Sequence, residues 1–437
     1  MKSFKKVYKF IAVVLVMLML SSVLVVTVPA DASGGREIVV NNLAGGRSYR
    51  LFIPSGYVPG QPLPLVVMLH GCAQNSAEFR DGTRMNQLAE QENFIVLYPE
   101  QSTSANSSRC WNWFEPAHQR RGSGEPQIIV DMVRRVQSEF TINNGAIFAA
   151  GLSAGGAMSI NLGVLYPDVF TANASFAGIA HQAGTSMLNA FGAMSPGNTA
   201  VAPATAARNA SNQVPASARS TVPTIIFHGT SDFTVVPRAS EHIETQMLEY
   251  NRIHGATIGN TPEVRNGTAN GLSYTVHTFR DANGNRIVEF HRINGLGHAW
   301  SGGNGAIAHT DSRGPNASLI AWKFFQEAAG LGGGGPILPT EPPTNPPTNP
   351  PVQPTTNPPV QPTNPPTNPP TGPPTNPPTN PPIQYIVVSA NVNQHSLAGR
   401  IPAAMFNHYF MIHGPMGVFN MYQVVGTNVW TSVRPSG

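Results

Sequence analysis

Gly151-Leu152-Ser153-Ala154-Gly155 directly follows the apolar run 146–150 and precedes the apolar segment 157–165. The run predicts a buried strand, and the segment after it predicts the start of a helix. A Gly-x-Ser-x-Gly turn between a strand and a helix holds its serine out at the end of a sheet, where the hydroxyl can act as a nucleophile. In a chain with 42 glycines the pattern also arises by chance, so the rest of the sequence has to support it.

Residues 1–32 carry the features of a secretory signal peptide. Four lysines, at positions 2, 5, 6 and 9, precede the apolar stretch 10–28, and Ala30-Asp31-Ala32 offers an A-x-A cleavage site. Because the stretch is long, an uncleaved membrane anchor is the alternative. The four lysines account for the whole formal net charge of +4, so the mature chain is close to neutral. We therefore expect a secreted, extracellular monomer that binds no nucleic acid and, once the signal is cleaved, no membrane.

Residues 33–330 alternate between strand-like and helix-like segments. The predicted strands are 37–40, 48–53, 65–69, 94–98, 146–150, 224–227, 273–279 and 286–292, and the predicted helices are 127–140, 241–252 and 315–329. This alternation predicts one α/β domain with a mostly parallel sheet that is covered by helices on both faces. Segment 181–220 has no apolar periodicity and interrupts the alternation, as either a lid over a site or a solvent-exposed loop.

The last hundred residues differ in composition from the rest of the chain. Residues 331–382 begin with glycines and continue as a Pro-Pro-Thr-Asn repeat, which predicts an extended linker. Residues 383–437 regain β-branched and aromatic residues and predict a small C-terminal module. A small aromatic module on a long spacer is typical of a tethered substrate binder.

Asp232 and His298 complete a predicted catalytic triad with Ser153. Asp232 lies just beyond the predicted strand 224–227, and His298 lies in a glycine-bounded loop after the predicted strand 286–292. The chain order nucleophile, acid, base, with each residue beyond the end of a strand, is typical of serine hydrolases built on a parallel sheet.

Other histidines and aspartates fit these roles less well. His291 falls inside a strand, His309 lies far along the following loop, and His228 is interpreted as a structural histidine. Asp168 is predicted at the end of a helix and Asp281 at the tip of a hairpin, so neither follows a buried strand.

The loop that follows strand 65–69 predicts the oxyanion hole. A tetrahedral oxyanion needs one N–H from the residue after the nucleophile and one from this loop. We assign these donors to the backbone N–H groups of Ala154 and Cys72. His70 is interpreted as a residue that holds the loop and not as a proton carrier.

Cys72 and Cys110 are the two cysteines of the chain. In an oxidising compartment an even count favours a disulfide, worth about 3–4 kcal/mol for this loop length, with two buried free thiols as the alternative. A bridge would bring Trp111 and Trp113 to the cleft, where they form part of its wall or belong to the core. Together with Trp300 they are the candidate substrate-binding residues. No cluster has the spacing of metal ligands, and no cofactor motif appears, so we expect neither.

Four motifs in order resemble the polyhydroxybutyrate depolymerase family of esterases, which are relatives of acetylxylan and feruloyl esterases. They are LHGC at 69–72, CWNW at 110–113, GLSAGG at 151–156 and GHAWSGG at 297–303. The resemblance extends over residues 36–329 and implies an α/β-hydrolase fold with the same three triad residues. One departure is that many secreted depolymerases carry a further cysteine where this chain has Ile179-Ala180-His181-Gln182.

The residues and the resemblance together predict a secreted serine esterase that acts on a polymeric ester. The resemblance implies a polyhydroxybutyrate-type polyester, with acetylated or feruloylated xylan as the alternative substrate. A protein of another class, a non-catalytic polymer binder on a hydrolase scaffold, is disfavoured by the complete Ser-Asp-His set.

Overall fold

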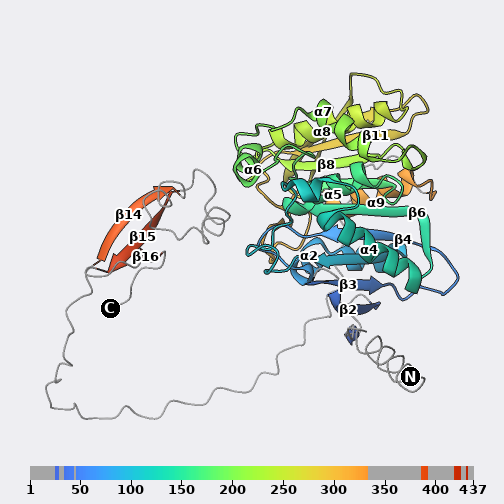
Figure 1. Ribbon diagram of the computed structural model, residues 1–437, viewed down its shortest axis with the longest axis horizontal. Coiled ribbons are helices and arrows are strands. Elements are labelled where there is room, and N and C mark those ends of the chain that lie inside the picture. Colours follow the sequence, from blue (N-terminus) through green and yellow to red (C-terminus); the bar gives the residue numbers. More distant parts are fainter. Residues whose placement is uncertain are drawn as a thin grey trace, which may run out of the picture. The chain divides into compact units, whose positions relative to one another are not determined.

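The computed structural model describes residues 25–28, 34–43, 46–332, 385–391, 418–424 and 430–431. The chain divides into two compact units. The first contains the described residues up to 332, and the second contains the three described strands near the C-terminus (Figure 1). The predicted linker lies outside the described residues. So does the predicted signal peptide, apart from a short strand at Val25–Val28.

The first unit is built on one eleven-stranded sheet with the order β1-β2-β3-β5-β4-β6-β7-β8-β11-β10-β9. Its central strands, from β5 to β11, are parallel, and antiparallel strands flank them on both sides. The strands are β1 (Val25–Val28), β2 (Arg36–Leu43), β3 (Arg47–Ile53), β4 (Leu63–Leu69), β5 (Ile95–Glu100), β6 (Ile142–Leu152), β7 (Ala172–Phe176), β8 (Thr224–Gly229), β9 (Glu263–Ala269), β10 (Leu272–Arg280) and β11 (Arg286–Ile293). A separate two-residue pair, β12 (Trp300–Ser301) and β13 (Thr310–Asp311), lies in the loop beyond β11.

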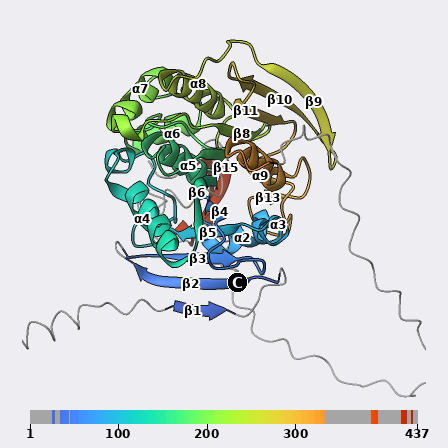
Figure 2. The ribbon, with the colours of Figure 1, turned by 90° about the vertical axis from the view of Figure 1, so that its right-hand side faces the viewer.

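Helices cover the two faces of this sheet as separate layers (Figure 2). One face carries α2 (Ser76–Thr83), α3 (Met85–Glu92) and α9 (Ala317–Ala328). The other carries α4 (Gly124–Glu139), α5 (Ala154–Leu165), α7 (Pro203–Gln213) and α8 (Arg238–Ile253). The remaining helical segments described in the first unit are η2 (Pro116–Gln119), α6 (Met187–Met194) and η3 (Ala216–Ala218). The mostly parallel α/β architecture predicted from the alternation is confirmed.

Burial explains the sequence patterns of the central elements. Strand β4 is apolar almost throughout because both of its faces are covered. Helix α4 buries one stripe and leaves the opposite stripe in solvent, as its helical periodicity requires. Every residue of α5 is buried, and its small residues allow this close approach. At Gly163, for example, an added Cβ would overlap the side chain of Asn173.

The insertion 181–220 is more ordered than either predicted interpretation requires. It contains α6 and α7, and α7 packs on α8. Ala206, Ala207 and Ala210 are fully buried, so this helix is part of the domain core and is not a solvent-exposed loop. Alanine gives little contrast in a hydrophobic pattern, which is why the periodicity is missing from the sequence.

The second unit contains a small antiparallel sheet. Its strands are β14 (Tyr385–Asn391), β15 (Val418–Val424) and β16 (Trp430–Thr431), with β15 in the middle. Four of the aromatic residues that mark this segment in the sequence lie in these strands: Tyr385, Phe419, Tyr422 and Trp430.

Candidate active site

Ser153 occupies a strained position between β6 and α5. Its backbone has φ 57° and ψ −120°, values that a residue with a side chain rarely adopts. The turn needs glycine on both sides because an added Cβ at Gly151 would overlap the backbone of Gly155, and one at Gly155 would overlap the carbonyl of Leu69. The N–H of Ser153 donates to the carbonyl of Phe176 (2.8 Å) and so ties the turn to β7. This is the local geometry of a nucleophile elbow.

Asp232 and His298 are joined by a hydrogen bond at the same edge of the sheet. His298 Nδ1 lies 2.7 Å from Asp232 Oδ2, which assigns the ring proton to Nδ1 and leaves Nε2 as an acceptor. Ser153, Asp232 and His298 follow β6, β8 and β11, and these parallel strands end at one edge of the sheet. No hydrogen bond among the described residues joins Ser153 Oγ to His298.

The carboxylate of Asp232 is stabilised in its charged form. Burial by itself would raise its pKa, but the nearby His298 and the hydrogen bonds from His228 and His298 hold this pKa well below its ordinary value. The N–H groups of Thr234 (2.9 Å) and Val235 (3.0 Å) also donate to Asp232 Oδ1. The group is thus an ionised acceptor at neutral pH, as the orienting acid of a triad must be.

His228 is a structural neighbour of the acid, as its interpretation from the sequence predicts. Its Nε2 lies 2.8 Å from the carbonyl oxygen of Val235 and 3.2 Å from Asp232 Oδ2, and its Nδ1 lies 2.6 Å from the hydroxyl of Ser240. Both ring nitrogens are occupied, and the side chain is buried. His228 therefore holds the acid loop and has no nitrogen free for proton transfer.

The loop that contains Cys72 packs directly against the nucleophile turn. A Cβ added to Gly71 would lie 3.5 Å from Cβ of Ser153. A disulfide joins Cys72 to Cys110, so the predicted bridge is confirmed and the alternative of two free thiols is wrong. Within residues 46–332, no acceptor is bonded to the N–H of Cys72 or of Ala154. Both groups are therefore available as hydrogen-bond donors.

His70 fixes the base of this loop. Its Nδ1 donates to the carbonyl of Gly71 (2.8 Å), and its Nε2 accepts the N–H of Gln101 (3.1 Å). The ring is fully buried, and burial lowers its pKa, so it stays neutral. The interpretation of His70 as a structural residue agrees with these contacts.

The three tryptophans predicted to bind substrate are core residues, and that prediction is wrong. Trp111, Trp113 and Trp300 are only 1%, 4% and 0% exposed. The indole N–H of Trp111 donates to the carbonyl of His70 (3.1 Å), and Trp300 stacks on Phe176 (ring centroids 3.5 Å apart). These tryptophans lie near the motifs in the sequence because they pack in the core beneath the motif loops, and their rings are not exposed to a ligand.

Glu125 is a buried carboxylate close to the candidate site that the sequence did not predict. This fully buried carboxylate accepts hydrogen bonds from the N–H of Asn112 (2.7 Å), from the side chain of Gln101 and from Arg47 (3.0 Å). Burial would raise its pKa, but its contacts with His118, Gln101 and Asn112 lower it. Glu125 thereby organises the segment that carries Cys110. Its position 13 residues from Asn112 gave no signal in the sequence.

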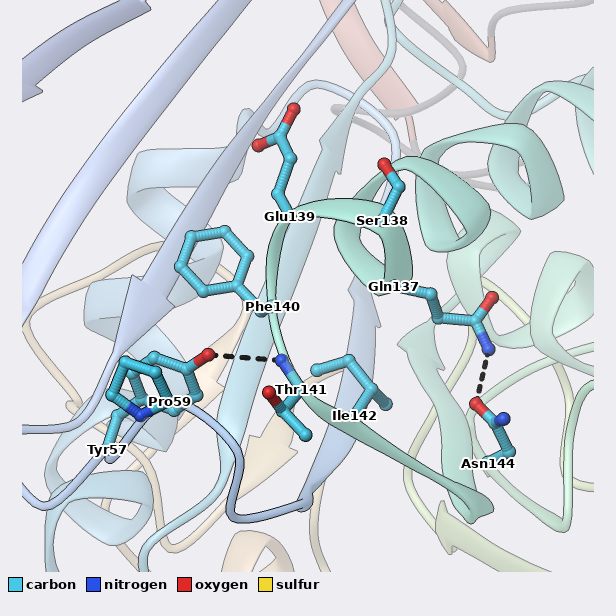
Figure 3. Close-up of a pocket in the computed structure, with 9 residues that line it drawn as sticks. All are labelled: Tyr57, Pro59, Gln137, Ser138, Glu139, Phe140, Thr141, Ile142 and Asn144. Atoms are coloured by element: carbon cyan, nitrogen blue, oxygen red, sulfur yellow. Dashed lines mark hydrogen bonds between the residues drawn. The ribbon is translucent and has the colours of Figure 1, made fainter.

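A pocket of about 490 Å³ lies at the opposite edge of the sheet (Figure 3). It surrounds the start of β6, where the N–H of Thr141 donates to the hydroxyl of Tyr57 (3.1 Å) and Gln137 donates to Asn144 (2.8 Å). None of the predicted site residues lines it.

In the described ranges no group of three or more His, Cys, Asp and Glu side chains is arranged to hold a metal ion. No helix in those ranges combines the length and apolar character that a bilayer crossing requires.

Comparison with known proteins identifies related sequences. Residues 47–269 match the family described as "Esterase PHB depolymerase". Poly(3-hydroxyalkanoate) depolymerase C of Paucimonas lemoignei is 37% identical over 249 residues, which cover 56% of this chain and 56% of that protein. Feruloyl esterase B of Neurospora crassa is 34% identical over 118 residues, or 27% of this chain and 39% of that protein. These matches span less than two thirds of either relative.

A solved structure supports the fold assignment. An acetyl xylan esterase from Aspergillus awamori matches with a TM-score of 0.51 at 21% sequence identity, over 60% of this chain and 93% of that one. At this identity the likeness concerns the fold. The predicted α/β-hydrolase fold is confirmed.

Proposed function

Because the chain belongs to the esterase PHB depolymerase family, we propose that it is a secreted serine esterase that hydrolyses ester bonds in a polymer. The observation that carries the proposal is the combination of a strained Ser153 with a bonded Asp232–His298 pair at one edge of the sheet. A strained nucleophile at the same sheet edge as a buried acid that is bonded to a partly buried histidine is the arrangement that acyl transfer needs.

The reaction follows from these roles. Ser153 Oγ attacks the ester carbonyl carbon while Nε2 of His298 takes the hydroxyl proton, and Asp232 stabilises the imidazolium that forms. The oxyanion accepts hydrogen bonds from the N–H groups of Cys72 and Ala154. The C–O bond then breaks, His298 returns the proton to the leaving alcohol, and an acyl-enzyme remains. Water, deprotonated by His298, hydrolyses this ester and restores Ser153.

A polymeric substrate is supported by the chain outside the first unit. A substrate-binding module on a long linker raises the enzyme concentration at a surface but gains little on small soluble esters. Among possible polymers we favour a polyhydroxybutyrate-type polyester. The poly(3-hydroxyalkanoate) depolymerase matches a larger share of this chain than the feruloyl esterase does. Acetylated or feruloylated xylan is the alternative, given that relatives by sequence are named feruloyl esterase and acetylxylan esterase.

One substrate panel tests this proposal. The full chain, a chain truncated after Gly335 and a Ser153→Ala blank are compared on p-nitrophenyl acetate, polyhydroxybutyrate granules and acetylated or feruloylated arabinoxylan. We expect granule clearing by the full chain, weaker clearing by the truncated chain, and equal kcat/KM for both on the soluble ester. Release of acetate or ferulate without granule clearing would assign the chain to xylan. An active Ser153→Ala blank would refute the serine mechanism.

A further inference from the structure

Gln74 forms a buried bridge between the loop of Cys72 and the loop of His298. Its Oε1 accepts the N–H of Gly71 (2.9 Å), and its Nε2 donates to the carbonyl of Ala308 (3.0 Å). The side chain is only 2% exposed, so both amide atoms depend on these partners. The two bonds connect segments that lie 234 residues apart in the sequence.

The peptide group between Gly71 and Cys72 shows why this bridge matters for the site. In a trans peptide the C=O and the N–H point in opposite directions, so holding the carbonyl of Gly71 sets the direction of the N–H of Cys72. That carbonyl accepts His70 Nδ1 (2.8 Å) and the N–H of Gln74 (3.4 Å). Gln74 thus holds Gly71 through its backbone and through its side chain. Glycine has no side chain to restrict its own rotation, so these bonds supply the restriction.

On its other side, Gln74 reaches the segment that packs against the base. Ala308 precedes His309, whose ring lies 6.0 Å from the ring of His298 and whose carbonyl accepts the N–H of Trp300 (2.9 Å). The same segment is attached to the end of α2 because the N–H of Asn304 donates to the carbonyl of Gly82 (2.8 Å). The proposed oxyanion donor and the proposed base are therefore connected through one buried amide.

We propose that Gln74 is a positioning residue that fixes the N–H of Cys72 relative to His298 for transition-state stabilisation. This rests on the proposed function, because it needs Ser153 as nucleophile and Cys72 as oxyanion donor. Removing one oxyanion donor costs about 10²–10³-fold in kcat in a well-studied protease, and a donor that is merely loosened should cost about tenfold or more. The substrate ground state makes little use of this bond, so KM should change little.

The test compares Gln74→Met, which loses both bonds at similar volume, with Gln74→Glu, which keeps the acceptor for Gly71. Gln246→Met is the matched control, since Gln246 is also fully buried and its amide bonds both backbone groups of His181 (2.8 and 2.9 Å). For each variant we measure kcat and KM on p-nitrophenyl acetate, the inhibition constant of phenylboronic acid, and the circular dichroism spectrum. The boronic acid forms a tetrahedral adduct with a serine nucleophile and so reports on oxyanion binding.

We expect Gln74→Met to lower kcat about tenfold or more and to raise the inhibition constant of phenylboronic acid by a similar factor. KM should stay within about twofold of the wild-type value. Gln74→Glu should recover part of the loss, and Gln246→Met should leave both quantities unchanged. A folded Gln74→Met with the wild-type kcat and the wild-type inhibition constant would overturn the proposal. If Gln74→Met does not fold, a folded Gln74→Glu with wild-type values of both quantities would overturn it. An active Ser153→Ala would instead show that the proposed function has failed.

Discussion

The two ends of strand β6 differ in backbone strain and in the burial of their charged groups. At its start, near Ile142, lies a pocket of about 490 Å³ whose Ser138 and Glu139 are exposed. At its end, Ser153 has a strained backbone and lies at the sheet edge where Asp232 is buried and bonded to His298. The comparison teaches that strain and buried charge, and not the volume of a hollow, indicate the candidate site.

The largest expected effect comes from replacing a serine by alanine at each end of β6 and comparing the two variants. Ser153→Ala should lower kcat on p-nitrophenyl acetate by about 10⁴-fold or more, since no other group can form the acyl-enzyme. His298→Ala should be of similar severity. Ser138→Ala, which removes the pocket serine, should leave kcat within about twofold. A large loss in Ser138→Ala would break the comparison and direct attention to the pocket.

The acids at the two ends give the next contrast. Asp232→Asn should lower kcat by about 10³–10⁴-fold, because an amide no longer favours the Nδ1-protonated form of His298. Glu139→Gln removes only an exposed ion pair with Arg135 and should have almost no effect on rate or stability. Steady-state kinetics and thermal melts of both proteins provide the measurement. Near-normal activity in Asp232→Asn would mean that another acid orients His298.

The disulfide sharpens the comparison because it lies at the end of β6 that carries the candidate site. Replacing Cys72 and Cys110 together by alanine should lower the free energy of unfolding by about 3–4 kcal/mol. It should also lower kcat by about tenfold, since the oxyanion loop loses a covalent attachment. Activity is measured well below the melting temperature, so that unfolding does not contribute. An unchanged kcat in the folded variant would show that hydrogen bonds alone hold the loop.

A smaller effect concerns pH and His181, which lies in the loop after β7. Burial lowers the pKa of His181 to about 3, so between about pH 6.5 and pH 3 the unfolded chain binds a proton that the folded chain does not. Stability from this group is complete above pH 6.5 and falls with decreasing pH, by at most about 1.4 kcal/mol per pH unit. The free energy of unfolding, measured by urea denaturation at several pH values in this window, should fall less steeply with decreasing pH in His181→Gln than in the wild type. An equal dependence on pH in both proteins would exclude this contribution.

The fold, and the position of the candidate triad at one edge of the sheet, could be predicted from the sequence because both follow from local order. Each of Ser153, Asp232 and His298 lies beyond the end of a strand-like segment, and parallel strands bring such positions to one edge. The Gly-x-Ser-x-Gly pattern further specifies the backbone of the turn, and its two glycines are required by close backbone contacts. These predictions needed no knowledge of which side chains touch across the fold.

Predictions that depended on distant contacts were less successful. Trp111, Trp113 and Trp300 lie beside catalytic motifs in the sequence, but whether an indole faces solvent is decided by what packs on it. Gln74 and Glu125 form hydrogen bonds near the candidate site with partners that no sequence pattern reveals, such as Ala308 for Gln74. Helix α7 was missed because its buried face consists of three alanines and a serine.

The central claim, that Ser153 is a nucleophile activated by the Asp232–His298 pair, is tested most directly by covalent labelling. The full chain is treated with a fluorophosphonate, which reacts with activated serines, and the modified peptide is identified by mass spectrometry. We predict a single adduct on Ser153, absent in Ser153→Ala and formed at least about 100-fold more slowly in His298→Ala. An adduct on another serine, or labelling of Ser153 at the same rate without His298, would contradict the account.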